Sequence, residues 1–129
     1  MSRFQGNSWG VELPPDWIGE HTEDCSTMYH PDGVGALQIS SYTKNDTGTD
    51  SDLKGLAQEH IDSGAKLGNA EAGVFDGYTF AFGIDGEFWQ YWYVARGNVA
   101  LLITYNCNEA DLGPEREHAK TIVASLKAT

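Results

Sequence analysis

The sequence has few basic residues and few cysteines, and each shortage narrows the classes of function. Eight lysines and arginines stand against 19 aspartates and glutamates in 129 residues, so the formal net charge is −11. Lysine and arginine form no cluster, which argues against nucleic acid or a membrane surface as a partner. Two cysteines, Cys25 and Cys107, are too few for a disulfide framework. We expect two free thiols and a cytoplasmic protein.

Long apolar runs are missing as well. No stretch of the chain approaches the roughly 18 consecutive apolar residues of a membrane span. Residues 1–8 contain no apolar core of a secretory signal. A chain of 129 residues with 40% hydrophobic residues can bury a core of its own. We therefore expect a single domain over residues 1–129, present as a monomer or a weak dimer.

Turn signals divide the segment from Ala70 to Cys107. Asp76-Gly77, Asp85-Gly86 and Gly97-Asn98 each separate two apolar runs. Such dipeptides accept the positive φ angles of tight hairpin turns. The sequence therefore predicts four antiparallel strands joined by three two-residue turns.

The predicted register places large aromatic rings on one face of these strands, because residues opposite each other in a hairpin share a face. The rings are those of Tyr78, Phe80, Phe82, Trp89, Tyr91 and Tyr93. Burying them contributes about as much as the whole net stability of a domain, roughly 5–15 kcal/mol. We therefore expect a helix to cover this face. The alternative is a ligand-binding pocket at Trp89, Tyr91 and Tyr93, with Thr104 and Asn106 at its rim.

Further strands and helices follow from apolar periodicity. Alternation or an apolar run predicts strands over Trp9–Leu13, Trp17–Glu23, Cys25–His30 and Ala36–Thr43. Leu53, Leu56, Ala57 and Ile61 form one stripe of a helix that begins at Asp50 or Ser51 and ends at Gly64. A second helix begins at Pro114, with Ala119, Ile122, Val123 and Leu126 on its apolar side. The fold class is α+β: a twisted antiparallel sheet of about six or seven strands, sandwiched by two or more helices.

Acidic residues concentrate in the first half of the chain. Two groups are candidates for binding a basic protein partner: Glu20, Glu23 and Asp24, and then Asp46, Asp50 and Asp52. An acidic surface steers basic partners toward it. The alternative is that these charges serve only solubility.

The candidate motifs for catalysis and for cofactor binding lack required residues or stand in the wrong structural context. The loop from Asp46 to Asp52 lacks an EF-hand's last ligand, because Ile61 stands where a bidentate glutamate is required. The glycines of Gly33-Val34-Gly35 lie in a hairpin rather than between a strand and a helix, which is the wrong context for a phosphate loop. We therefore expect no catalytic residue, no metal and no cofactor. A hydrolase or metal enzyme of unrecognised type is the less favoured alternative.

Two short sequence motifs near the ends of the chain resemble motifs of a known protein family. Gly10-Val11-Glu12-Leu13-Pro14-Pro15-Asp16-Trp17 resembles the opening strand of the Mog1/PsbP-like group, and Ile122-Val123-Ala124-Ser125-Leu126 is similar to its last helix. The resemblance implies a twisted antiparallel sheet with helices on both faces. It also implies a protein that binds other proteins without catalysis, such as a small bacterial accessory or immunity-type protein. It transfers no functional residues.

Overall fold

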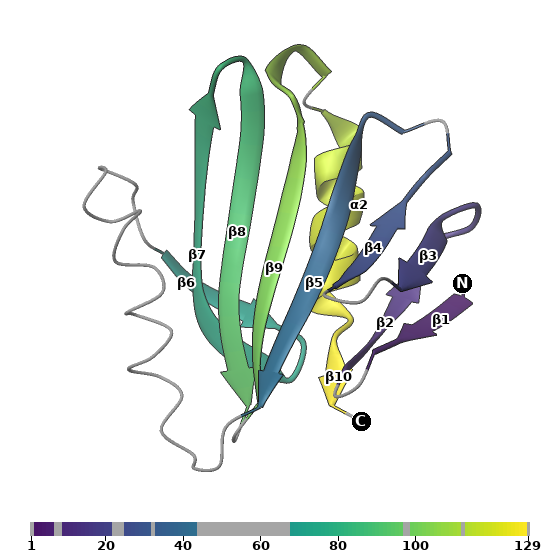
Figure 1. The fold of residues 1–129 in the computed structure, drawn as a ribbon, viewed down its shortest axis with the longest axis vertical. Coiled ribbons are helices and arrows are strands. Elements are labelled where there is room, and N and C mark those ends of the chain that lie inside the picture. The colour runs from purple at the N-terminus through teal and green to yellow at the C-terminus, as the bar shows by residue number, and fades with distance from the viewer. Residues whose placement is uncertain are drawn as a thin grey trace.

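The structure, a computed structural model, describes residues 2–6, 9–21, 25–31, 33–43, 68–96, 99–111 and 113–128. These ranges form two antiparallel sheets, a 3-10 helix and an α-helix (Figure 1). The smaller sheet has the order β1-β2-β10, from β1 (Ser2–Gln5), β2 (Trp9–Leu13) and β10 (Lys127–Ala128). The larger sheet has the order β3-β4-β5-β9-β8-β7-β6.

The strands of the larger sheet are β3 (Ile18–His21), β4 (Ser26–Tyr29), β5 (Gly35–Thr43), β6 (Gly68–Ala72), β7 (Phe75–Ile84), β8 (Glu87–Arg96) and β9 (Val99–Asn108). The 3-10 helix η1 (Glu109–Asp111) leads from β9 to the helix α2 (Pro114–Ala124). An α+β fold with an antiparallel sheet of seven strands confirms the coarse prediction. The described ranges contain fewer helices than predicted, and the predicted helix from Asp50 to Gly64 lies outside them.

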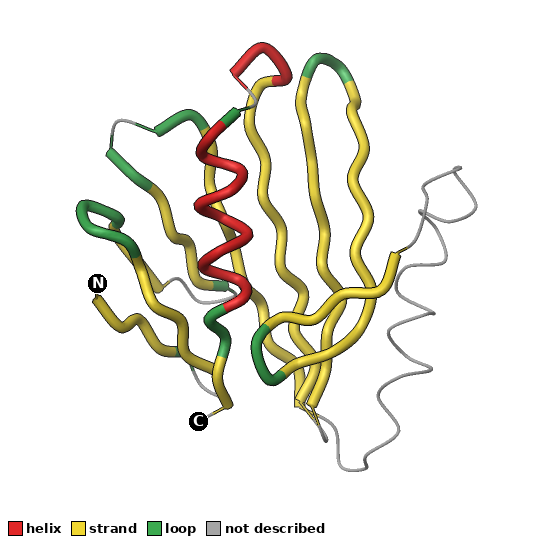
Figure 2. The backbone as a smooth tube through the Cα atoms, turned by 180° about the vertical axis from the view of Figure 1, so that it is seen from behind, coloured by secondary structure: helices red, strands yellow, loops and turns green. Residues whose placement is uncertain are grey.

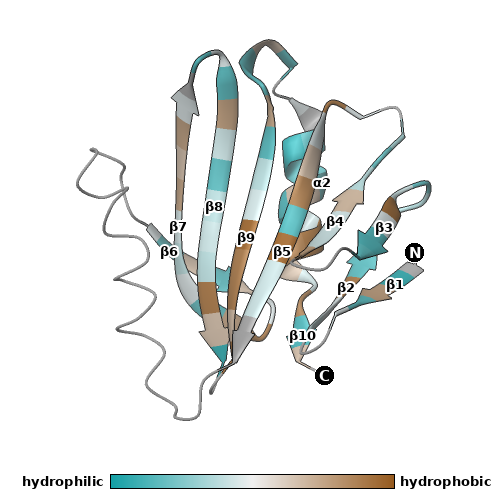
Figure 3. Ribbon diagram, viewed as in Figure 1, coloured by the Kyte–Doolittle hydropathy of each residue, from teal (hydrophilic) through white to brown (hydrophobic). Residues whose placement is uncertain are grey.

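The main core lies between one face of the larger sheet, α2 and the smaller sheet. Helix α2 runs along this face, behind the sheet in Figure 1 and in front of it in Figure 2. Leu37 and Ile39 of β5 are buried in the core, while Gln38 between them is exposed. Hydrophobic and hydrophilic colours accordingly alternate along the β5 ribbon in Figure 3. The predicted apolar stripe of the C-terminal helix is fully buried: Ala119, Ile122, Val123 and Leu126 are each at most 2% exposed. The helix itself ends at Ala124, before Leu126.

Two of the three predicted hairpin turns are confirmed by their register. At the β7–β8 turn, Ile84 pairs with Glu87, and Asp85 and Gly86 have φ angles of 52° and 82°. Positive φ at both positions is what a type I′ turn requires. At the β8–β9 turn, Arg96 pairs with Val99 as predicted, although Gly97 and Asn98 themselves lie outside the described residues.

The first predicted turn is wrong. Asp76 and Gly77 lie inside β7, and the turn between β6 and β7 is Gly73-Val74. Gly73 has a φ of +62°, and a Cβ there would collide with the carbonyl oxygen of Leu126. The Val74 amide donates to that same oxygen over 3.1 Å. The glycine that sets this turn is therefore selected by a distant segment as well as by the turn geometry.

The remaining strand predictions hold with shifted ends. Strands β3 and β4 are shorter than the predicted Trp17–Glu23 and Cys25–His30, and β5 begins one residue before the predicted Ala36–Thr43. Strands β1 and β10 were not predicted, because they are short and carry no clear apolar alternation. They pair on either side of β2.

Neither cysteine is in a disulfide; Cys107 is buried and Cys25 is partly exposed. Within the ranges given above, no helix combines the length and the hydrophobicity that crossing a membrane demands.

Candidate functional site

The face of the larger sheet that points away from α2, here called the outer face, carries the predicted aromatic cluster. Five of its six rings, those of Tyr78, Phe80, Phe82, Tyr91 and Tyr93, belong to one group that is separate from the main core. Ring centroids lie 5.3 Å apart between Phe80 and Tyr91 and 5.9 Å apart between Phe80 and Tyr93. Trp89 meets Tyr91 edge to face at 6.1 Å. These spacings are typical of favourable aromatic pairs, so the predicted face is confirmed as a physical cluster.

Burial differs within this cluster. Phe80 and Tyr93 are 3% and 5% exposed, whereas Trp89 and Tyr91 are half-buried. Burial raises the pKa of the Tyr91 hydroxyl above its usual value. Helix α2 packs on the opposite face, so it is not the helix expected to cover these rings. The other predicted helix falls outside the described residues.

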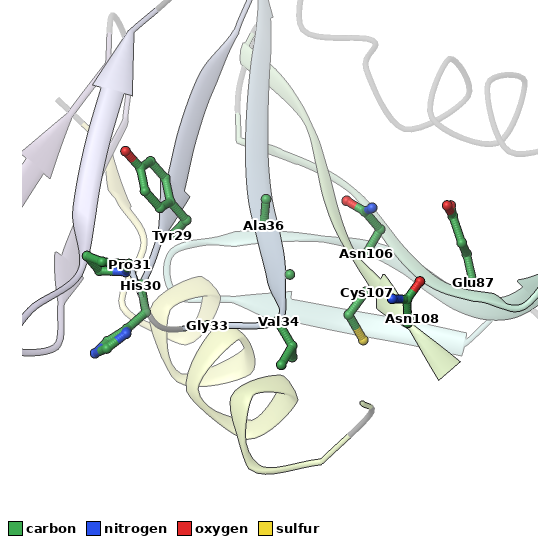
Figure 4. A pocket seen from close by; sticks show the side chains of 11 residues that line it. Tyr29, His30, Pro31, Gly33, Val34, Ala36, Glu87, Asn106, Cys107 and Asn108 are labelled. Atoms are coloured by element: carbon green, nitrogen blue, oxygen red, sulfur yellow. The ribbon is translucent and has the colours of Figure 1, made fainter. Parts of the chain in front are cut away.

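A cavity of about 440 Å³ opens at one end of the larger sheet, where the β4–β5 loop meets the ends of β8 and β9. Its polar lining side chains are Tyr29, His30, Glu87, Asn106 and Asn108. Tyr29, Ala36, Asn106 and Glu87 point to one side of the sheet, and Cys107 points to the other (Figure 4). Asn106 pairs with Trp89 across the β8–β9 ladder, so the cavity borders the aromatic cluster. Asn106, predicted at a pocket rim, does line a cavity; Thr104 does not line it.

One wall of the cavity is fixed by Glu115, a residue to which the sequence assigned no functional site. The Val34 amide donates to Glu115 Oε2 over 2.9 Å, and the Gly35 amide donates to Oε1 over 2.8 Å. The Tyr105 hydroxyl donates to Oε1 over 3.0 Å. Charge-assisted bonds of this kind are stronger than neutral ones. Helix α2 is thereby tied to the β4–β5 loop.

The glycines of this loop are needed for close approach. A Cβ at Gly33 would collide with the Glu115 carboxylate, and a Cβ at Gly35 would collide with the carbonyl oxygen of Asn106. The Gly33-Val34-Gly35 segment therefore does present backbone amides to an anion. The anion is a side chain of the same protein rather than a phosphate.

Two buried acids next to this contact keep their protons at neutral pH. Burial is the main cause that raises the pKa of Tyr105 and of Cys107, and the Glu115 charge adds to both shifts. Cys107 is 3% exposed. Nucleophilic cysteines have a lowered pKa instead, so Cys107 has the properties of a structural thiol.

The guanidinium of Arg116 contacts side chains on the face of the larger sheet that packs against α2, here called the inner face. Its Nε donates to Gln90 Oε1 over 3.2 Å, and its guanidinium lies 4.7 Å from the centre of the Phe88 ring. Gln90 Nε2 in turn donates to Thr79 Oγ1 over 3.1 Å. Arg116 therefore stabilises the packing of α2 on the sheet.

Glu20 is the one predicted partner-binding residue that lies in the described ranges. It is exposed on β3 and accepts a hydrogen bond from the Tyr29 hydroxyl over 3.1 Å. That bond is the main cause of a raised pKa at Tyr29. Tyr29 lines the cavity, so its hydrogen-bond partner Glu20 lies next to the lining without being part of it. The other predicted residues, Glu23, Asp24, Asp46, Asp50 and Asp52, lie outside the described ranges. Among the described residues, no three His, Cys, Asp or Glu side chains gather closely enough to hold a metal ion.

Comparison with known proteins finds solved structures with a similar fold but assigns the chain to no family. No family model matches the chain, and neither does any curated protein. A crystal structure from Bacteroides thetaiotaomicron aligns with a TM-score of 0.69 and 23% identity over 94% of this chain. The chain spans only 45% of the length of that protein. LpqN of Mycobacterium tuberculosis, which is involved in cell envelope biogenesis, aligns with a TM-score of 0.65 and 13% identity, over 94% of this chain and 83% of LpqN.

Proposed function

We propose that this protein is a non-enzymatic, cytoplasmic protein-binding module of the Mog1/PsbP-like group, and that it binds a basic partner at the cavity end of the outer face. The observation that carries the proposal is the cavity itself. It is lined by hydrogen-bonding side chains, and it has Glu87 in its lining and Glu20 beside it. The net charge of −11 steers basic partners toward such a surface.

The framework around the cavity suits recognition of another protein. Strands β5, β8 and β9 form a continuous ladder that holds the lining residues in fixed register. The Glu115 contact fixes the neighbouring loop. Pre-organised surfaces lose less conformational entropy on binding. Polar side chains at the rim beside aromatic rings are also typical of protein interfaces.

Site-specific photo-crosslinking tests the proposal. Gln38 is exposed on β5, and it pairs with Thr104 on the outer face, two residues from Ala36 in the cavity. A photo-reactive amino acid at Gln38 should give a discrete adduct with one basic protein in the source cell. The matched control is the same replacement at Thr121, which is exposed on α2. Adducts of equal yield from both positions, or no adduct from Gln38, would contradict the proposal.

A small-ligand-binding protein is the second candidate. Its support is the aromatic cluster, in which Trp89, Tyr91 and Tyr93 stand in one row of β8 and Trp89 adjoins the cavity residue Asn106. A metabolite that binds there should change tryptophan fluorescence in the native protein and not in the Trp89→Phe variant. A flat response across a broad library would exclude this candidate.

A further inference from the structure

We propose that the cavity receives a positively charged side chain of the partner, a lysine ammonium or an arginine guanidinium. The inference rests on the proposed protein-binding function and names the chemistry of recognition at the same site. It follows from the charge, the hydrogen-bonding capacity and the size of the cavity.

The cavity lining contains one acidic side chain, Glu87, and one basic side chain, His30, which points to the side opposite to Tyr29, Asn106 and Glu87 (Figure 4). Glu87 is exposed in the lining, at the end of β8 opposite Asn108. Glu20 is exposed beside Tyr29 and accepts a hydrogen bond from its hydroxyl. Neither carboxylate forms an ion pair with a described basic residue. A cation in the cavity is therefore attracted at close range by Glu87, whereas Glu20 lies four strands from β8 in the sheet and acts only at long range.

The nearby charged groups of α2 do not change this balance. Arg116 is bound to Gln90 and Phe88 on the inner face, away from the cavity. The Glu115 carboxylate is occupied by two backbone amides and the Tyr105 hydroxyl. Neither group therefore neutralises the charge of Glu87 in the cavity lining.

The other lining groups offer acceptors to a cation that has only donors. The amide oxygens of Asn106 and Asn108 and the hydroxyl of Tyr29 all accept hydrogen bonds, whereas ammonium and guanidinium groups only donate them. Trp89, next to Asn106 on the same face, adds an aromatic ring that attracts cations. A volume of about 440 Å³ is large enough for one long side chain with bridging water.

Short peptides test the inference directly. We would titrate the protein with acetyl-Gly-Arg-Gly-amide, acetyl-Gly-Lys-Gly-amide and acetyl-Gly-citrulline-Gly-amide, and follow the side-chain amide signals of Asn106 and Asn108 by NMR. Citrulline keeps the shape of arginine without its charge. The arginine or lysine peptide should shift both signals, whereas the citrulline peptide should not. Added salt should weaken the binding, because the attraction is screened.

Charge-neutralising variants localise the effect. Glu87→Gln should weaken binding of the cationic peptide about 2- to 5-fold, the range expected for an exposed ion pair, and Glu20→Gln, four strands away, should weaken it less. Glu117→Gln is the matched control, because Glu117 is 72% exposed on α2, where it pairs with Lys120. Equal binding of the citrulline peptide, or equal weakening by Glu117→Gln, would overturn the inference. A Gln38 adduct with a partner would survive that result, so this failure differs from failure of the proposed function.

Discussion

Glu115 joins three segments that are far apart in the sequence. Its carboxylate accepts hydrogen bonds from the amides of Val34 and Gly35, 81 and 80 residues away, and from the hydroxyl of Tyr105. Unpaired backbone amides that are taken from water destabilise a fold. This one side chain therefore secures both the β4–β5 loop and the adjoining wall of the cavity.

Replacing Glu115 by glutamine should lower the free energy of unfolding by about 1–3 kcal/mol. The glutamine keeps one acceptor oxygen, but its amino group faces a backbone donor and the charge assistance is lost. Urea-induced unfolding measures the change. Glu117→Gln in the same first turn of α2 is the control, because Glu117 is exposed and its ion pair with Lys120 contributes less than about 1 kcal/mol. Equal losses in both variants would show that the helix terminus, and not the loop contact, is responsible.

Single residues were predictable from sequence where their role depends on strand register. The face shared by Phe80, Tyr91 and Tyr93 follows from counting outward from the Asp85-Gly86 turn. Asn106 was placed at a pocket rim in the same way. Glu115 was not predictable, because its partners belong to a loop at the other end of the chain. A glutamate in the first turn of a helix is also common without any such contact.

At the scale of elements, the two hairpins on either side of β7 turn for different reasons. The β7–β8 turn contains Gly86, and a Cβ added at this residue would have no atom within 4 Å. The β6–β7 turn contains Gly73, whose missing Cβ leaves room for the carbonyl oxygen of Leu126. The first turn is set by local backbone geometry, and the second is set also by packing against the segment after α2.

Alanine at these two glycines should separate local strain from packing. Gly86→Ala should cost about 1–2 kcal/mol, the penalty of a left-handed backbone for an L residue. Gly73→Ala should cost about 2–5 kcal/mol, because overpacking against backbone adds about 1–3 kcal/mol. Thermal or urea unfolding of the two variants provides the comparison. A cost for Gly73→Ala no larger than that for Gly86→Ala would refute the packing role of Leu126.

At the scale of the whole molecule, stability should depend on alkaline pH. Tyr105 and Cys107 have usual pKa values of 10.0 and 9.0, and burial raises both in the folded protein. Above about pH 9 the unfolded chain therefore releases these protons before the folded protein does. At neutral pH both groups are protonated in the folded and unfolded states, so their ionisation does not affect the free energy of unfolding. As the pH rises above about 9, their ionisation in the unfolded chain lowers the free energy of unfolding. The net charge of −11 acts in the same direction, because further ionisation increases repulsion.

Unfolding by urea at a series of alkaline pH values should show this loss. Each group contributes a slope of up to about 1.4 kcal/mol per pH unit. Tyr105→Phe removes one of the two ionisations, so its slope should be shallower than that of the native protein even if its stability at neutral pH is lower. An unchanged slope in Tyr105→Phe would show that this phenol does not control alkaline unfolding.

The sequence by itself determined the features that depend on neighbours along the chain. Alternation and turn residues set the ladder of β7, β8 and β9, and helical spacing set the buried stripe of α2. Only the tertiary structure decided the Gly73-Val74 turn, the pairing of β1 and β10 with β2, and the cavity bounded by the Glu115 contact. Those features depend on backbone and side-chain atoms of distant segments meeting at a few ångströms, and no local pattern encodes such a meeting.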